Sequence, residues 1–274
     1  MQIAIQGEPG SFSHEAALKF APQATLFPCA LSSEVFSALI EAPVEAAVIP
    51  IENSLAGSVA EHYDLLLTNE VAIERELLLR IRHNLIAVPG TRLDQIQRVY
   101  SHPVALAQCR RFFESHPGME AIPYYDTAGS VKQLVELRDR SSGGIASVQA
   151  AFHYGGEVLE SGIEDNPENY TRFFLIRRRS EVRSDAAADK VSLAFTVENR
   201  PGTLVEALQV FASQGTNLTR IESRPVHGQP WHYVFYADYQ LSSPDSADSA
   251  LESLAQHCSM VKELGRYRAG QLET

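Results

Sequence analysis

Apolar and polar positions follow two different patterns along this chain. In residues 1–179, short apolar runs that fit buried strands alternate with stretches that have the spacing of helices. The runs that predict strands lie at residues 3–5, 46–51, 99–100 and 122–125, and an extended stretch at 77–88 indicates a crossing between two lobes. The predicted helices begin near residue 13 and cover residues 32–40, 59–67, 103–113, 130–140 and 147–154. Strands and helices that alternate in this way indicate an α/β fold with mainly parallel strands.

The pattern changes after a polar segment at residues 180–189, which lacks periodicity and is predicted to be a linker. Val191, Leu193 and Phe195 alternate with polar or small residues as in a half-buried strand. A helix is then predicted to open at Pro201-Gly202, because Leu204 and the apolar residues after it recur at helical spacing. Strands are then predicted at residues 217–225 and 231–237, with a turn that begins at His227 between them. A helix at 246–257 and a last strand at 260–267 follow. The order βαββαβ is that of a ferredoxin-like domain.

Small hydroxyl or amide residues recur in the loops between strands and helices of the first part. In an open α/β sheet these loops form the ligand crevice, and helix N-termini there attract anions. Any one of these residues could simply cap a helix, but their recurrence predicts an anion-binding cleft. The residues are Ser11, Asn53, Ser54, Thr127 and Ser147.

Composition and charge narrow the range of functions. The 274 residues carry a formal net charge of -11, which argues against a nucleic-acid or anionic-membrane surface. The N-terminus alternates apolar and polar residues and turns at Gly7, unlike a signal peptide. Cys29, Cys109 and Cys258 lie far apart, so no metal spacing or disulfide framework is predicted and a cytoplasmic location is expected. The histidines show no metal spacing, and no dinucleotide motif is present.

Several segments, taken in order, resemble those of prephenate dehydratases with a C-terminal ACT regulatory domain. They are residues 7–13, 52–54 with 57–59, 101–103 with 108–109, 126–128, 145–147, 169 with 171–173, and 221–225. The resemblance covers nearly the whole chain. It implies an α/β catalytic domain like a type 2 periplasmic-binding protein at residues 1–179, with a second lobe at about 80–160. It also implies a linker at 180–189 and a ferredoxin-like ACT domain at 190–274.

The resemblance also implies a reaction that needs no cofactor and no metal. Prephenate loses its ring carboxylate as CO2 and its 4-hydroxyl as water, giving phenylpyruvate. Thr171 occupies the position of the family's essential threonine. Because a threonine hydroxyl is a weak acid, we expect it to donate a hydrogen bond to the leaving oxygen as charge develops there. The ring carboxylate loses its charge in the transition state, so the strongest anion contacts should hold the side-chain carboxylate, through Arg172 or helix N-termini.

Three residues near these motifs have two open roles each. Phe173 could form an apolar wall for the ring or belong to the core. Glu52 could supply a second proton or brace its loop. His102 could act as a general acid or cap the helix that Pro103 begins.

The second domain is implied to bind phenylalanine between paired ACT domains and to inhibit the enzyme, which requires a homodimer or homotetramer. Thr203 stands where the family usually has alanine, so the affinity and identity of the effector stay open. A dimerisation module with a vestigial pocket is the alternative. The residues assigned to this site are Gly202, Thr203, Leu204, Asn217, Glu222, Ser223 and Arg224.

Two other functions fit parts of the sequence. Arogenate dehydratases act on a substrate with an amino acid side chain in place of the pyruvyl group, and residues 53–67 and 126–129 also resemble those enzymes. The absence of a transit segment favours prephenate slightly. A non-catalytic amino-acid sensor is the alternative of another class, and the intact motif at 171–173 argues against it. We expect no fused chorismate mutase, since the first strand begins at residue 2.

Overall fold

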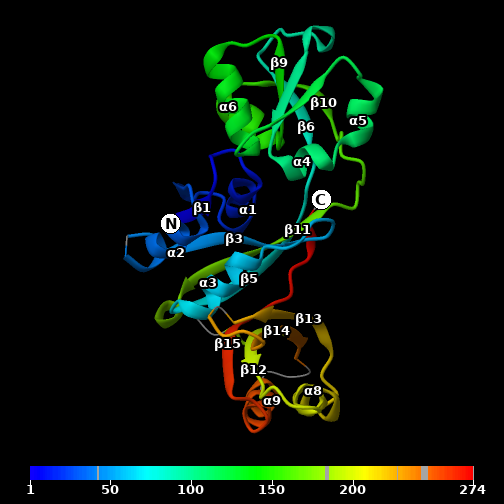
Figure 1. The fold of residues 1–274 in the computed structure, drawn as a ribbon. Coiled ribbons are helices and arrows are strands. Elements are labelled where there is room, and N and C mark those ends of the chain that lie inside the picture. The colour runs from blue at the N-terminus through cyan, green and yellow to red at the C-terminus, as the bar shows by residue number, and fades with distance from the viewer. Residues whose placement is uncertain (42, 183–184, 227, 242–245, 274) are drawn as a thin grey trace. The chain divides into compact units, whose positions relative to one another are not determined.

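The computed structural model describes residues 1–41, 43–182, 185–226, 228–241 and 246–273. The chain packs as two compact units, which are treated separately below (Figure 1). Unit 1 comprises Met1–Ala60, Leu77–Phe173 and the C-terminal residues from Leu272, and unit 2 comprises Glu61–Glu76 and Phe174–Gln271. Residues 183 and 184 of the predicted linker and His227 of the predicted turn lie outside the described residues.

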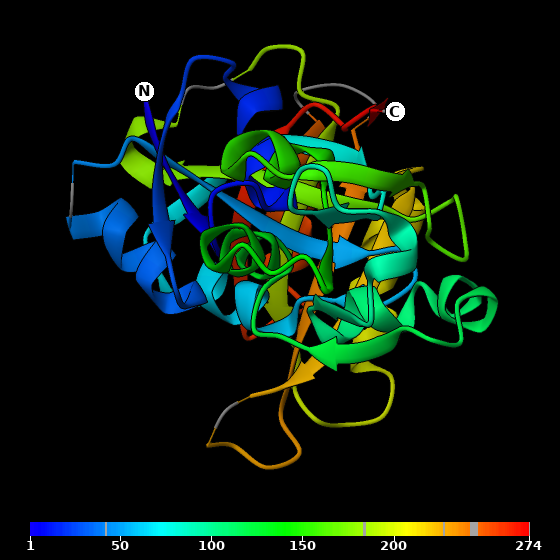
Figure 2. The same ribbon diagram turned by 90° about the horizontal axis from the view of Figure 1, so that it is seen from above.

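The first sheet of unit 1 is built on parallel strands. β1 (Gln2–Gln6) pairs in parallel with β2 (Thr25–Cys29) on one side and with β3 (Ala46–Asn53) on the other. The helices α1 (Phe12–Phe20) and α2 (Ser32–Glu41) pack against β1 and β3 (Figures 1 and 2). Ile3, Ile5 and Val48 are fully buried there because both faces of the sheet are covered, which explains why the strands appear in the sequence as continuous apolar runs.

Short and long strands extend this sheet. β4 (Gly57–Ser58) folds back on the end of β3, and the first residues of β11 (Tyr170–Arg178) lie beside β3. The predicted extended stretch at 77–88 is confirmed as the end of β5 (Val71–Arg80) followed by β6 (Asn84–Ala87). β16 (Leu272–Glu273) pairs in parallel with β5.

The second sheet of unit 1 has the strand order β10-β6-β9-β7-β8. β7 pairs in parallel with β8 and β9, whereas β6 runs antiparallel to β9 and β10. The helices α6 and α7 contact this sheet. The elements are β7 (Arg98–Ser101), β8 (Glu120–Pro123), β9 (Ser142–Ala146), β10 (Glu157–Ser161), α6 (Thr127–Leu137), α7 (Val148–Tyr154) and the 3-10 helix η1 (Leu93–Gln95).

The single helix predicted over residues 103–113 is wrong, because the structure has two short helices there. α4 (Pro103–Ala107) ends at Gln108, and α5 (Arg110–Ser115) begins two residues later. The Asp165 carboxylate accepts the N–H groups of Arg110 at 3.1 Å and Arg111 at 2.9 Å, so a residue far away in the sequence caps α5. The periodicity of the segment continues across the break and therefore could not reveal it.

Unit 2 contains a four-stranded antiparallel sheet in the order β13-β14-β12-β15 with two helices. The predicted order βαββαβ is confirmed. Its core combines Val191, Leu193 and Phe195 of β12 with Ala207 and Phe211 of α8. The elements are β12 (Lys190–Thr196), α8 (Thr203–Ser213), β13 (Leu218–Pro225), β14 (Tyr233–Gln240), α9 (Ser246–Ala255) and β15 (Met260–Tyr267).

Unit 2 also includes α3 (Ala60–Thr68) from Glu61 onward and the 3-10 helix η2 (Arg179–Glu181). Arg224 of β13 donates to both carboxylate oxygens of Asp64 in α3, at 3.1 and 2.7 Å. Lys262 of β15 donates to the backbone oxygen of Leu67 at 2.7 Å. These contacts hold α3 against the ferredoxin-like sheet. None of the described helices is long and apolar enough to cross a membrane.

Candidate active site

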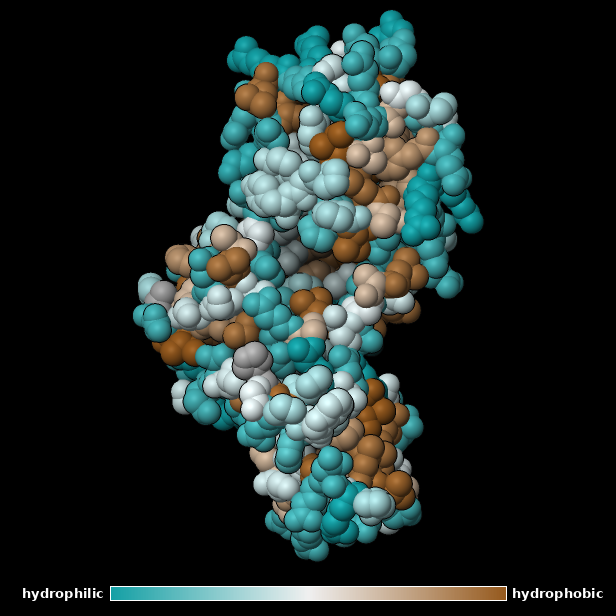
Figure 3. Space-filling view, viewed as in Figure 1, coloured by the Kyte–Doolittle hydropathy of each residue, from teal (hydrophilic) through white to brown (hydrophobic). Residues whose placement is uncertain are grey.

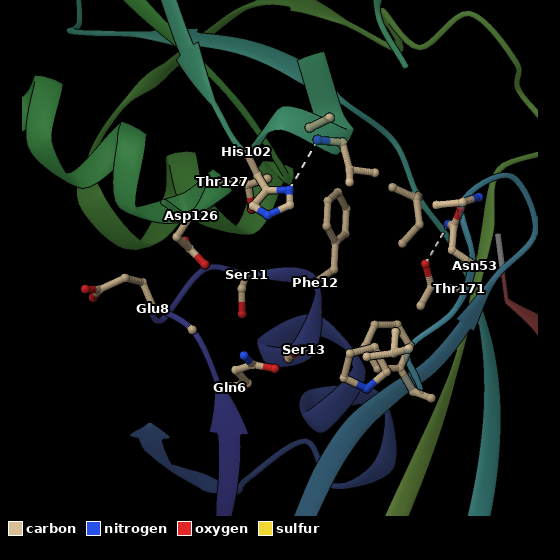
Figure 4. Close-up of a pocket in the computed structure, with 18 of the residues that line it drawn as sticks. Gln6, Glu8, Ser11, Phe12, Ser13, Asn53, His102, Asp126, Thr127 and Thr171 are labelled. Atoms are coloured by element: carbon tan, nitrogen blue, oxygen red, sulfur yellow. Dashed lines mark hydrogen bonds between the residues drawn. The ribbon is translucent and has the colours of Figure 1, made fainter. Parts of the chain in front are cut away.

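A cavity of about 840 Å³ lies within unit 1 (Figure 4). It is lined by the loop between β1 and α1, the end of β3, the first turns of α4 and α6, and the start of β11. Five of the residues predicted from sequence line it: Ser11, Asn53, Thr127, Thr171 and Phe173. Its size is typical of a small-molecule site.

The Thr171 hydroxyl is held by the side chain of Asn53. Thr171 is 8% exposed, and its Oγ1 accepts a hydrogen bond from Asn53 Nδ2 at 2.9 Å (Figure 4). The backbone N–H groups of Leu55 and Ala56 donate to Asn53 Oδ1 at 3.0 and 2.8 Å, which identifies the oxygen and nitrogen ends of this amide. Because Asn53 is the donor, the hydroxyl hydrogen of Thr171 is left for a ligand in the cavity.

A chain of side-chain hydrogen bonds continues from Asn53. Its Nδ2 also donates to Oδ1 of the fully buried Asn169 at 2.8 Å, and Asn169 Nδ2 donates to Gln108 Oε1 at 3.0 Å. His83 Nε2 lies 2.9 Å from the same Gln108 oxygen and must therefore carry the hydrogen. Burial lowers the pKa of His83, more than its bond to Gln108 raises it, which agrees with a neutral ring.

Gln108 and His83 are site residues that the sequence did not assign. Both line the cavity. Gln108 belongs to a segment that carries the family resemblance, but its role could not be derived from its position. His83 lies in a run of three polar residues, Arg82 to Asn84, within the largely apolar extended stretch at 77–88, and this run is the signal that could have pointed to a site.

The cavity combines apolar walls with two helix N-termini. Phe12, Ile81 and Phe173 are among the apolar lining residues. Ser11 lines the cavity and caps α1 by accepting His14 N at 3.3 Å. Thr127 is the first residue of α6. The first turns of these helices carry a partial positive charge, and their caps accept the His14 and Gly129 N–H groups.

Among the described residues, two carboxylates line the cavity, and no lysine or arginine does. Asp126 caps α6 by accepting Gly129 N at 2.7 Å, and burial, with a smaller contribution from Glu8, raises its pKa. Glu8 forms an ion pair with Lys132 at 3.1 Å. An anionic ligand would therefore be held by helix N-termini and neutral donors.

Two residues predicted to bind the substrate, Ser54 and Ser147, bond to the backbone of other segments and do not line the cavity. Ser54 is exposed, donates to Glu168 O at 3.2 Å and accepts Tyr170 N at 3.0 Å. Ser147 is 1% exposed and caps α7, and its hydroxyl donates to Gly10 O at 2.7 Å. Neither is among the lining residues.

Of the remaining residues considered from sequence, His102 lines the cavity and Arg172 does not. Arg172 is 7% exposed and does not line the cavity; its guanidinium lies 4.0 Å from the Glu52 carboxylate. His102 lines the cavity and caps α4, because its Nδ1 accepts Val104 N at 3.3 Å (Figure 4). Among the described residues, no cluster of His, Cys, Asp and Glu could hold a metal ion.

Three of the predicted regulatory residues lie together in unit 2. Gly202, Thr203 and Leu204 line a hollow of about 180 Å³, together with Trp231 and other residues. Thr203 is 4% exposed, and its hydroxyl donates to the backbone oxygen of Glu198 at 2.7 Å. The hydroxyl that distinguishes Thr203 from alanine is therefore bonded to the protein's own backbone.

The other four predicted regulatory residues do not line this hollow. Asn217 donates to Gln240 at 3.1 Å, and Glu222 pairs with Arg220 on the same strand. Ser223 is exposed, and Arg224 is engaged with Asp64.

Comparison with known proteins assigns both parts of the chain. The prephenate dehydratase family profile matches residues 3–181, and the ACT domain profile matches residues 191–255. The chain is 36% identical to arogenate dehydratase 2 of Petunia hybrida, over 97% of this chain and 71% of that protein.

Solved structures that are similar over 98% of this chain include the following two. One is prephenate dehydratase from Arthrobacter aurescens in complex with L-Phe, with 33% identity, a TM-score of 0.89 and 90% of that chain covered. The other is GqqA, described as a novel type of quorum quenching acylase, with 33% identity, a TM-score of 0.90 and 98% of that chain covered.

The two family profiles match the parts of the chain before and after residues 180–189, where the hydrophobic pattern changes. The bilobed α/β fold and the ferredoxin-like ACT domain expected from the resemblance are confirmed. The chain belongs to the prephenate dehydratase family, with an ACT domain at residues 191–255.

Proposed function

We propose that this chain converts prephenate to phenylpyruvate, CO2 and water. The observation that carries the proposal is the Thr171 hydroxyl, which lines the cavity and accepts from Asn53, so that its own hydrogen remains to be donated. In the reaction the bond between the ring and its carboxylate breaks, and the electron pair completes the aromatic ring. The 4-hydroxyl leaves with its bonding electrons as hydroxide and takes up one proton from the solvent, so that the prephenate dianion and a proton give the phenylpyruvate anion, CO2 and water.

Thr171 stabilises the leaving oxygen in this scheme. Negative charge develops on that oxygen as its bond to the ring breaks, and a donor already in place strengthens its hydrogen bond as the charge grows. Asn53 is the group that assists Thr171, because its N–H polarises the hydroxyl and holds it in one position. Phe12 and Phe173 provide apolar walls for the ring.

The side-chain carboxylate of the substrate is held at the first turns of α1 and α6, near Ser11 and Thr127. Of the two groups considered for this role, the helix N-termini are supported by the lining of the cavity, and Arg172 is not. This carboxylate keeps its charge throughout the reaction, so a firm grip on it does not oppose the chemistry.

Arogenate is the second candidate substrate. Its ammonium group could find a partner in the carboxylates of Glu8 and Asp126, which line the cavity. The relative from Petunia hybrida is an arogenate dehydratase. The ratio of kcat/KM for prephenate and arogenate distinguishes the two substrates.

Regulation by phenylalanine is part of the proposal. It is supported by the ACT domain, by the L-Phe complex of the similar enzyme and by the hollow at Gly202–Leu204. Figure 3 shows apolar surface over β13 and α8 of unit 2, where Ile221 and Val205 are 46% and 67% exposed. A second copy of the chain, in a homodimer or homotetramer, would cover this surface.

In this scheme residues 1–179 catalyse the reaction, residues 180–189 form a linker and residues 190–274 regulate the enzyme. The two matched segments, 3–181 and 191–255, support this division. A reducing cytoplasm is proposed as the location, because Cys29, Cys109 and Cys258 are free cysteines.

Turnover of prephenate by the purified chain, with and without phenylalanine, tests this function. Phenylpyruvate should appear, and its rate of formation should fall as phenylalanine is added. Arogenate and an N-acyl amide serve as comparison substrates, the latter because one similar structure is described as an acylase. Binding of prephenate without phenylpyruvate formation would instead support a non-catalytic sensor.

A further inference from the structure

Glu8 lies in the loop between β1 and α1, and its carboxylate accepts hydrogen bonds from three donors in or next to α6 and α7. Its Oε1 accepts Tyr125 OH at 3.0 Å, just before α6. Its Oε2 accepts Lys132 Nζ at 3.1 Å, in α6, and Tyr154 OH at 3.5 Å, at the end of α7. Figure 4 shows the Glu8 side chain directed away from Thr171.

The same loop approaches α6 and α7 closely at two glycines. A Cβ atom on Gly7 would lie 2.7 Å from Asp126 Oδ2, and one on Gly10 would lie 2.8 Å from the Cα of Ala150. Both glycines have a φ of +91°. The backbone oxygen of Gly10 also accepts the Ser147 hydroxyl at 2.7 Å. The loop is therefore fixed directly against the first turns of α6 and α7.

This packing sets the separation of two groups that the proposed function uses. Ser11, at the end of the loop, begins α1, and Thr127 begins α6. The carboxylate of Glu8 bridges the two sides, because its own backbone belongs to the loop and its partners belong to α6 and α7. If Glu8 is removed, the loop still accepts the Ser147 hydroxyl but loses the ion pair between Glu8 and Lys132. Among the described residues, this is the only ion pair that the loop forms.

We propose that Glu8 is a positioning residue for substrate binding, which clasps the β1–α1 loop to α6 and so sets the spacing of the helix N-termini that hold the substrate's side-chain carboxylate. This inference rests on the proposed function. The carboxylate keeps its charge during the reaction, so its contacts are equally strong in the ground state and the transition state. Loosening such contacts raises KM and leaves kcat nearly unchanged.

The test compares Glu8→Ala, Glu8→Gln and Lys132→Met in prephenate turnover. We expect KM to rise about threefold to tenfold in Glu8→Ala and Lys132→Met, with kcat within about twofold of the wild type, as is typical when an exposed ion pair is lost. Glu8→Gln should have a smaller effect, because its oxygen still accepts from Tyr125. The double variant Glu8→Ala/Lys132→Met should be no worse than Glu8→Ala alone, since Glu8→Ala already removes the contact that Lys132 makes.

Glu114→Gln is the matched control, because Glu114 is an exposed glutamate on α5 outside the cavity lining. Binding of phenylpyruvate, which carries the same side-chain carboxylate, is measured by calorimetry in parallel and should weaken by the same factor as KM rises. A wild-type chain without turnover would refute the proposed function, and phenylpyruvate binding would still test the clasp. Unchanged KM and unchanged phenylpyruvate affinity in folded Glu8→Ala would overturn the inference, and so would a fall in kcat with KM unaltered.

Discussion

Replacing Thr171 with valine removes the hydroxyl from the candidate active site while keeping the shape of the side chain. Asn53 Nδ2 then loses one acceptor but keeps Asn169 Oδ1 at 2.8 Å and the backbone oxygen of Tyr170 at 3.2 Å. The buried amide is therefore not left without a partner, and we expect the free energy of unfolding to fall by about 1 kcal/mol or less.

The effect on catalysis should be much larger. Removal of one preorganised donor to developing negative charge typically lowers kcat by about 10²- to 10³-fold, or about 3–4 kcal/mol. Because the bond strengthens only as the 4-hydroxyl leaves, KM should change little. Thr171→Ser keeps a hydroxyl that Asn53 can hold, and its kcat should stay within about tenfold of the wild type.

Steady-state formation of phenylpyruvate from prephenate measures both constants, and thermal unfolding of each variant shows whether it is folded. The reasoning would be refuted if folded Thr171→Val kept more than about a tenth of the wild-type kcat. Equal losses in the valine and serine variants would also refute it, because the hydroxyl would then not be the group that matters.

Three further predictions concern the loop and the titration of the fold. Gly10→Ala should destabilise unit 1 by about 1–3 kcal/mol in urea unfolding, because Gly10 has a positive φ and its Cβ would lie close to Ala150. Gly155→Ala is the control, since Gly155 has a φ of +74° but open space around it, and it should cost less. Equal losses of stability in the two variants would rule out the clash with Ala150. Ser147→Ala should lower the free energy of unfolding by about 1–2 kcal/mol, since it removes a helix cap and the bond to Gly10, and an unchanged urea midpoint would contradict this. Burial lowers the pKa of His83 in the folded state, so the unfolded state binds more protons below pH of about 6.5, and stability should fall as the pH drops below that value. Urea unfolding between about pH 7.5 and 5.5 measures this slope, which should be smaller in His83→Gln.

Secondary structure and the candidate catalytic residue could be predicted because they depend on neighbours in the sequence. The apolar period predicts most strands and helices of both parts, and the predicted βαββαβ order of residues 190–267 is confirmed, with some bounds shifted by about three residues. Thr171 stands in a short motif at the start of an apolar strand, and the resemblance of this and other segments to one family singled it out. The information that predicts an element lies within a few positions of it, and the information that singled out Thr171 lies in short segments read one by one.

Tertiary structure alone decided which polar groups meet. Asn53 and Thr171 are 118 positions apart, and Glu8 and Tyr154 are 146 apart, so no local pattern could pair them. Asp165 ends the apparent helix at 103–113 by capping α5 from a distant loop. A hydrogen bond depends on the positions of both partners to within a few tenths of an ångström, and the packing of distant segments sets these positions. The sequence predicted most of the elements and, through the family resemblance, the candidate catalytic residue, whereas only the packing determined the groups that contact this residue.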